Sequence, residues 1–197
     1  KDLRLDMPAV VAQAAQAFGA LLPDATKSNE QLLNFFYERV NGYLRERGAS
    51  AQEADAVIAA RPMWGEFPKA LDAVRAFAAL PEAPALAAAN KRVGNILKKA
   101  EGEVSGTVDA ALLQEDAEKA LYGALQTVAP QANAAFDQGD YTASLRVLAA
   151  LKGPVDAFFD GVMVNADDAA LKANRLALLQ QLHAAMNRVA DLSRLAA

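Results

Sequence analysis

The residues best suited to binding chemistry form a short basic segment, ANKRVGNILKKA, at positions 89–100. It carries Lys91, Arg92, Lys98 and Lys99 and no acidic residue, in a chain whose formal net charge is −4 and whose pI is near 5.1. Lysine and arginine side chains bind phosphate oxygens through their charge and their hydrogen bonds. The segment is therefore a candidate phosphate-binding site if its cations share one surface.

A helix over 82–101 would bring these cations together. At about 100° per residue, all four and Asn95 fall on one face, and Leu86, Val93 and Ile96 fall on the opposite face. Two interpretations stay open: a solvated face whose last lysines complement the helix dipole, or a phosphate-binding face in which Asn95 contacts a base or ribose. The acidity of the whole chain argues against a non-specific nucleic-acid binder and is compatible with one nucleic acid bound at one place.

Arg175 is a second unusual residue, because it falls among the apolar positions of a helix expected over 168–195. A charge on an apolar stripe has to be paired or has to reach out of the stripe. Asp156 and Asp160, at the edge of the preceding helix's apolar face, are the expected partners in a buried ion pair that fixes two helices. A direct contact between Arg175 and RNA is the alternative.

Aromatic residues gather in the loop RPMWGEF, where Arg61, Trp64 and Phe67 would form a platform for stacked bases. The alternative, which we favour, is that Trp64 packs onto a neighbouring helix and seals the core. Residues 35–37 are consecutive aromatics, so at least one must point away from the core. Tyr37 is the expected one, because its hydroxyl can stay hydrated.

The sequence lacks the patterns of catalytic and metal-binding sites. It has no cysteine and a single histidine, His183, which lies beside an apolar stripe and is expected to be hydrogen-bonded there or to extend to the surface. It has no Glu-x-x-His pattern, its GEVSG stretch lacks the lysine of a phosphate-binding loop, and one histidine supports no catalytic triad. We therefore expect no active site, metal or cofactor in these 197 residues.

The elements that must position these residues are helical. Alanine is abundant, apolar residues recur at spacings of three and four, and β-branched residues do not alternate, which predicts an all-α chain. Short connections favour an antiparallel helical bundle. The helix around Gly94 should continue through it, and another helix should approach closely there. Capping residues, prolines and glycines predict helices over 6–22, 28–48, 50–60, 67–80, 82–101, 111–137, 140–151, 154–164 and 168–195.

We divide the chain at residue 80 into an N-terminal helical region, 1–80, and a helical bundle, 81–197. The uncharged run 8–23 is too short and too polar to span a bilayer, so we expect no membrane partner. Because the first residue is Lys1 and not Met, we expect the chain to be part of a longer protein.

Several blocks of the sequence resemble a known family. LPEAPALAAANKRVGNILKKAE, with FFDGVMV and LKANRLALL further along, closely resembles the C-terminal part of the bacterial glycyl-tRNA synthetase β subunit. FFYERVNGYLRERGASAQEADAVIAARP resembles the stretch that precedes it, so the resemblance covers about residues 35–195. It implies an all-α, DALR-type anticodon-binding domain.

The resemblance further implies binding of the anticodon stem-loop of glycine tRNA, whose anticodons share two cytosines, in support of glycine attachment in the cytoplasm. It implies an α2β2 assembly with a synthetase α subunit, which holds most of the glycine and ATP site, so that ATP and Mg belong to the parent enzyme. From the helix geometry, Lys91, Arg92, Lys98 and Lys99 are our candidates for phosphates and Asn95 for a base or ribose. The rival interpretation is a non-catalytic helical interaction module whose basic face binds another subunit.

Overall fold

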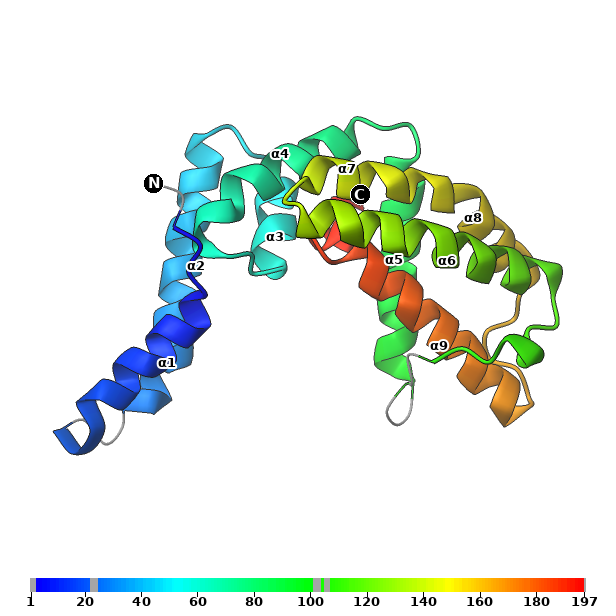
Figure 1. Cartoon of the computed structure of the whole chain (residues 1–197), viewed down its shortest axis with the longest axis horizontal. Helices are drawn as coiled ribbons and strands as arrows, with labels where there is room; N and C mark the ends of the chain where they lie inside the picture. The colour runs from blue at the N-terminus through cyan, green and yellow to red at the C-terminus, as the bar shows by residue number, and fades with distance from the viewer. Residues whose placement is uncertain (1–2, 22–24, 101–103, 105–106, 197) are drawn as a thin grey trace.

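The computed structural model describes residues 3–21, 25–100, 104 and 107–196, and every regular element in these ranges is helical (Figure 1), which confirms the all-α prediction. The α-helices are α1 (Met7–Phe18), α2 (Asn29–Glu46), α3 (Ala51–Ala59), α4 (Phe67–Ala78), α5 (Ala83–Lys99), α6 (Asp116–Asp137), α7 (Tyr141–Val147), α8 (Lys152–Gly161) and α9 (Ala169–Met186). The 3₁₀ helices are η1 (Gly19–Leu21), η2 (Ala25–Ser28), η3 (Trp64–Glu66), η4 (Ala110–Leu112), η5 (Leu148–Leu151) and η6 (Leu192–Leu195).

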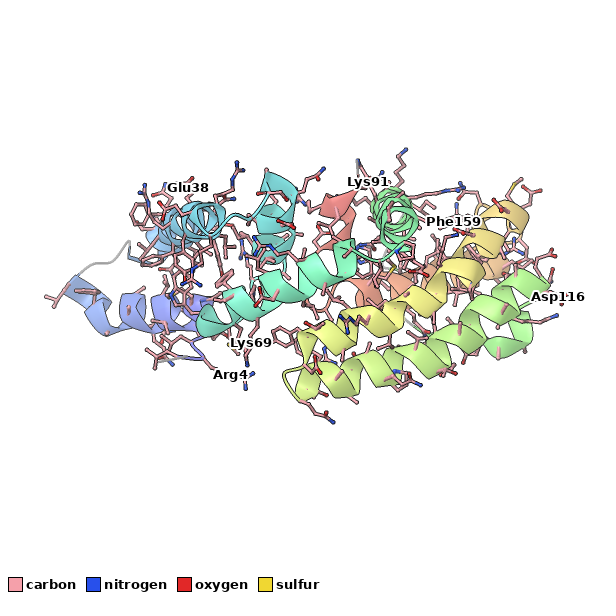
Figure 2. All side chains as sticks on the ribbon, turned by 90° about the horizontal axis from the view of Figure 1, so that it is seen from above. Arg4, Glu38, Lys69, Lys91, Asp116 and Phe159 are labelled. Atoms are coloured by element: carbon pink, nitrogen blue, oxygen red, sulfur yellow. The ribbon has the colours of Figure 1, made fainter. Side chains whose placement is uncertain are left out.

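Helices α5 to α9 form the main body. Helix α6 packs against α7, α8 and α9, and it runs antiparallel to the α7–α8 segment (Figure 1). Helix α5 crosses this layer steeply: Figure 2 shows α5 end-on, with α6 and α7 in the plane of the view. It contacts α8, α9 and η6. The basic segment is therefore held by helices that are distant in sequence.

The core of the body is mainly aliphatic. Leu121, Leu145, Phe158, Leu178 and Leu182 come from α6, α7, α8 and α9, and each is 1% exposed or less. Burying one such side chain stabilises a fold by about 1.5–3 kcal/mol. These contacts fix the helices on which α5 rests.

At the other end of the molecule, α1 and α2 lie side by side as a helical hairpin that extends away from the body (Figure 1). The hairpin joins the body through α3, which packs on α4 and η6, and α4 in turn packs on α7. Residues 3–5 lie against η3: the Trp64 amide donates to the Leu5 carbonyl, and a Cβ at Gly65 would lie 2.7 Å from the Leu3 carbonyl oxygen. Glycine is therefore required for this close approach.

Tyr37 lies on the buried face of α2, so our expectation that it points outward is wrong. It is 7% exposed, in one stripe with Val40 and Leu44, and its ring packs against Trp64. Phe35 points away instead and is 50% exposed. The three- and four-residue spacing of the stripe decides the phase of the helix, and the hydroxyl's preference for water does not.

Several helix boundaries differ from those expected, and three of the differences have a clear cause or replacement. Helix α6 begins at Asp116, with η4 before it. The chain runs from α7 through η5 into α8 without the break expected at KGP, because Pro154 lies in the first turn of α8, where its missing N–H costs nothing. Helix α9 ends at Met186, because the chain turns at Asn187, whose side chain donates to the His183 carbonyl at 2.7 Å.

Candidate nucleic-acid interface

Helix α5 presents one polar side and buries the other. It continues through Gly94 as expected. Its buried side includes Leu86 and Val93, which are 1% and 0% exposed. Lys98 and Lys99 lie in the last turn, where cations interact favourably with the helix dipole. The dipole therefore accounts for part of the lysine content, but it does not require the cations one turn or more earlier.

The opposite side of α5, which we call the basic face, consists of Lys91, Arg92, Asn95, Lys98 and Lys99. All five side chains are exposed, and Lys91 lies on the outer side of α5 in Figure 2. Among the described residues, no carboxylate forms an ion pair with any of these four cations. Glu101 and Glu103, the next acidic residues in the sequence, lie outside the described residues.

Arg92 also contacts α8. Its guanidinium carbon lies 4.1 Å from the centre of the Phe159 ring, and Figure 2 shows Phe159 beside α5. This cation–π contact positions the guanidinium over the ring face. The N–H groups of a guanidinium point outward in its plane, so Arg92 keeps donors for an anionic ligand.

A groove of about 610 Å³ lies beside the basic face. Helix α5 contributes Lys91, Gly94, Asn95 and Lys98 to it. This volume lies in the range of about 300–1,000 Å³ that is usual for sites binding small molecules. The other walls are mostly polar and come from α3, α9 and the C-terminal segment, with Gln52, Asp55, His183, Asp191, Ser193, Arg194 and Ala196.

The close approach expected at Gly94 is made by α9. A Cβ at Gly94 would lie 3.6 Å from Nε2 of His183. Burial lowers the pKa of His183 below its usual value; the Asp191 carboxylate opposes this shift and Lys98 adds to it. His183 is therefore mainly neutral at pH 7 and offers one donor and one acceptor.

The carboxylates in the groove have partners within the protein. Asp55 accepts a hydrogen bond from Asn41 Nδ2 at 3.1 Å. Asp191 accepts from the Ser193 amide and hydroxyl at 3.1 and 2.6 Å and from Arg194 Nε at 3.2 Å. In the described part of the chain, neither of the two groove lysines from α5 has an ion-pair partner, and Asp55, whose partner is a neutral amide, is the one groove carboxylate without a paired cation.

A buried asparagine pair that the sequence reading missed holds α5 in place. Asn90, 0% exposed, donates to Asn187 Oδ1 at 2.8 Å, and Asn187 Nδ2 donates back to Asn90 Oδ1 at 3.0 Å. Asn90 precedes Lys91 in the chain, so this clamp between α5 and the end of α9 sets the position of the basic face. The signal in the sequence was Asn90 itself, an amide side chain at a buried position on the otherwise apolar side of the helix.

Arg175 is buried as expected, but its partner is neither Asp156 nor Asp160. It is 6% exposed, and its Nε lies 2.7 Å from Oε1 of Glu118, which is 0% exposed. Its Nη1 also donates to the Met163 carbonyl at 2.8 Å. Glu118 lies on α6, which packs against α9, so the nearest buried carboxylate comes from a helix that is remote in sequence.

The two aspartates predicted as partners lie elsewhere. Asp156 accepts a hydrogen bond from Lys152 at 2.6 Å, one turn earlier on α8, and Asp160 is exposed. The Arg175–Glu118 pair thus joins α9 to α6 and fulfils a structural role. Nothing in its burial suggests a contact with RNA.

Trp64 packs into an aromatic cluster and does not form an open platform. Its ring is 6.0 Å from that of Phe36 and 5.7 Å from that of Phe67, centre to centre, with nearly perpendicular planes. This arrangement is the favoured edge-to-face geometry of packed aromatic residues. The loop therefore seals the core, as the alternative that we favoured predicts.

Among the described residues, no group of three or more His, Asp or Glu side chains is placed to hold a metal ion. In the same ranges, no helix combines the length and the apolar character needed to cross a membrane.

Comparison with known proteins decides the family. Residues 86–192, more than half of the chain, match the DALR anticodon binding domain. The chain belongs to the DALR anticodon binding domain family. It is also 63% identical over 198 residues to the glycine–tRNA ligase beta subunit of Delftia acidovorans, covering 100% of the chain and 28% of that relative. The same subunits of Polaromonas naphthalenivorans and Thiobacillus denitrificans are 62% and 60% identical over 198 residues, again covering 100% of the chain and 27% and 28% of the relatives.

These matches confirm the resemblance to glycyl-tRNA synthetase β subunits. The chain spans little more than a quarter of the length of those relatives. Within the chain, the DALR match includes the basic face, α9 and the first residue of η6, whereas α3, which forms one wall of the groove, lies before it. The division of the chain at residue 80 stays a prediction.

Proposed function

We propose that the chain binds the anticodon stem-loop of a glycine tRNA through the basic face of α5. The observation that carries the proposal is the exposure of four cations on one side of a rigidly packed helix, without ion-pair partners among the described residues. Membership in the DALR anticodon binding domain family supports the same ligand. Fixed cations of this kind neutralise phosphates and release counterions from the nucleic acid.

The residues of the interface divide into two roles. Lys91, Arg92, Lys98 and Lys99 hold backbone phosphates, which orient the stem-loop but carry no sequence information. Asn95 lines the groove and offers an amide donor and acceptor to an unstacked base or to a ribose. The neutral His183 supplies a further polar group on the facing wall.

The proposal extends to the parent enzyme. The relatives are named glycine–tRNA ligase beta subunits, and the chain corresponds to little more than a quarter of their length. In this proposal the chain is the tRNA-holding part of such a ligase, which works with a synthetase α subunit in the cytoplasm. The ATP, the Mg and the chemistry of glycine attachment belong to other parts of that enzyme.

A comparison of the affinities for two tRNAs that differ only in the anticodon tests the proposal. We expect the chain to bind glycine tRNA more tightly than the same tRNA with its two shared anticodon cytosines replaced. Asn95→Ala should reduce this difference by about 1–3 kcal/mol if it reads a base. Asn34→Ala, a matched change on the exposed polar side of α2, should leave the difference unchanged.

Equal binding of both tRNAs by the chain, unaffected by Asn95→Ala, would contradict base reading in the groove. The rival interpretation predicts another result: a purified α subunit would bind the chain, and substitutions on the basic face would abolish that complex while tRNA binding stayed absent or unchanged.

A further inference from the structure

Helix α2 carries more apolar surface than the described chain buries. At about 100° per residue, its apolar side chains span roughly 200° of the helix circumference, about twice the arc of a helix with one buried side. Half of this arc, with Leu33, Val40 and Leu44, is buried, and the elements that α2 packs on are α1, α3 and η2. The other half holds Leu32, Phe35 and Tyr43, which are 43%, 50% and 43% exposed.

This exposure is concentrated in one region. Met163 apart, every large apolar side chain that is exposed among the described residues lies between Leu3 and Met63. This stretch contains the α1–α2 hairpin, which projects from the body in Figure 1. Exposed apolar side chains scattered singly are normal on a protein surface, but Leu32, Phe35 and Tyr43 share one side of α2, and a contiguous patch of this kind marks an interaction surface.

Two arginines complete the open side of α2. Arg39 lies over the Phe35 ring at 5.2 Å and Arg47 over the Tyr43 ring at 4.8 Å. Aromatic residues and arginine are the types enriched in protein–protein interfaces. We call Leu32, Phe35, Arg39, Tyr43 and Arg47 the α2 face.

A hollow of about 410 Å³ adjoins the α2 face. Its walls include Arg39 and Tyr43 from that face and Trp64, Phe67 and Pro68 from the aromatic loop and α4. A pocket of this kind, lined by aromatic rings, accepts an apolar anchor side chain from a partner.

The charges on α2 favour a protein over a nucleic acid as the occupant. Glu30, Glu38 and Glu46 balance Arg39, Arg45 and Arg47 along the helix and its C-cap, so the helix has no excess of positive charge to attract phosphates. The matching relatives contain almost three quarters of their length outside the region aligned with this chain. We infer that the α2 face docks on another folded part of the same polypeptide in a full-length beta subunit.

Hydrogen exchange tests this inference, which does not depend on tRNA binding. The 197-residue chain is compared alone and in place of its aligned part in the full-length Delftia acidovorans relative, to which it is 63% identical. Docking should slow the exchange of α2 amides at least about tenfold in the full-length protein, because local opening would then have to break the interface. Phe35→Glu with Tyr43→Glu should restore the fast exchange of the isolated chain.

Gln31→Glu with Asn34→Glu is the matched control, since it adds the same charge to the exposed polar side of α2. It should leave the protection in the full-length protein unchanged. The comparison of the two unsubstituted proteins needs no variant, so it stays decisive even if the double glutamate variant unfolds.

Three results would overturn the inference. Equal exchange of α2 in the isolated chain and in the full-length protein would leave the α2 face without an intramolecular partner. A dimer of the isolated chain in sedimentation, dissociated by the Phe35→Glu and Tyr43→Glu pair but not by the control, would assign the face to a second copy. Loss of tRNA binding by that pair alone would assign it to RNA.

Discussion

Replacing Arg175 with alanine should leave the buried carboxylate of Glu118 without its ion-pair partner. Glu118 is 0% exposed, and the Nε of Arg175 is 2.7 Å from its Oε1. Removing one member of a buried pair costs roughly 3–5 kcal/mol, because the remaining charge keeps its desolvation without its partner. In a domain of this size, each kcal/mol lost from the free energy of unfolding lowers the Tm by about 2–4 °C, so we expect the Tm to fall by roughly 6–20 °C.

Thermal unfolding followed by circular dichroism measures this fall. Arg175→Met combined with Glu118→Gln should lose much less than Arg175→Ala, because no charge is left buried and the glutamine oxygen can still accept the backbone hydrogen bonds of the α6 N-terminus. Lys152→Ala, which breaks the half-exposed pair with Asp156, should change the Tm little. An Arg175→Ala variant as stable as Lys152→Ala would refute the reasoning.

The same pair predicts a sensitivity to acid. Burial alone would raise the pKa of Glu118, but the hydrogen bond and charge of Arg175 and the amides of Glu115 and Gln114 outweigh it, so the pKa lies below its usual 4.5. The folded state therefore binds this proton less tightly than the unfolded state. The stabilisation is complete above the unfolded pKa and is lost as the pH falls through the lower folded pKa, a loss that Glu118→Gln should remove from a pH series of the Tm.

The other predictions concern α5 and its support. Gly94→Ala should raise the free energy of unfolding in urea by about 0.5–1 kcal/mol, since alanine favours the helix and its methyl would meet His183 at an ordinary contact distance; a decrease would contradict this. Asn90→Ala should lower it by about 1–3 kcal/mol, because Asn187 would lose its buried partner; an unchanged value would mean that the clamp is dispensable. Since burial lowers the pKa of His183, protonation of this histidine favours the unfolded state. The free energy of unfolding should therefore fall as the pH drops below about 6.5, the usual histidine value. His183→Gln should flatten this dependence, and a variant with the same pH profile as the unsubstituted chain would refute the prediction.

The helices could be predicted because their signals are local. Ser50 and Glu53 form the capping box of α3, with bonds of 3.2 and 2.8 Å. Asp140 caps α7 as expected, and of Asp167 and Asp168, which are both suited to cap the last helix, Asp168 caps α9. The phase of α5 followed from its apolar spacing, so the exposure of the basic face could be predicted without the fold.

The contacts between remote helices could not be predicted in the same way. The burial of Arg175 followed from its apolar neighbours, but Glu118 lies 57 positions away on a helix whose packing partner was unknown. Its spacing with Leu121 and Leu125 places it on the buried stripe of α6, and a second charge on such a stripe was the signal that could have paired the two. The Asn90–Asn187 clamp spans 97 positions and depends wholly on the tertiary arrangement.

The salt dependence of tRNA binding tests the central claim most directly. Each phosphate contact contributes about −0.7 to −0.9 to the slope of log K against log salt concentration, so Lys91→Gln with Lys98→Gln should flatten the slope by roughly 1.4 to 1.8 and weaken all tRNAs alike. Lys69→Gln with Lys119→Gln removes the same charge from α4 and α6, and Lys69 lies on the other side of the molecule from Lys91 in Figure 2. We predict that this control leaves the slope nearly unchanged. Equal slopes for the two double variants would contradict the account.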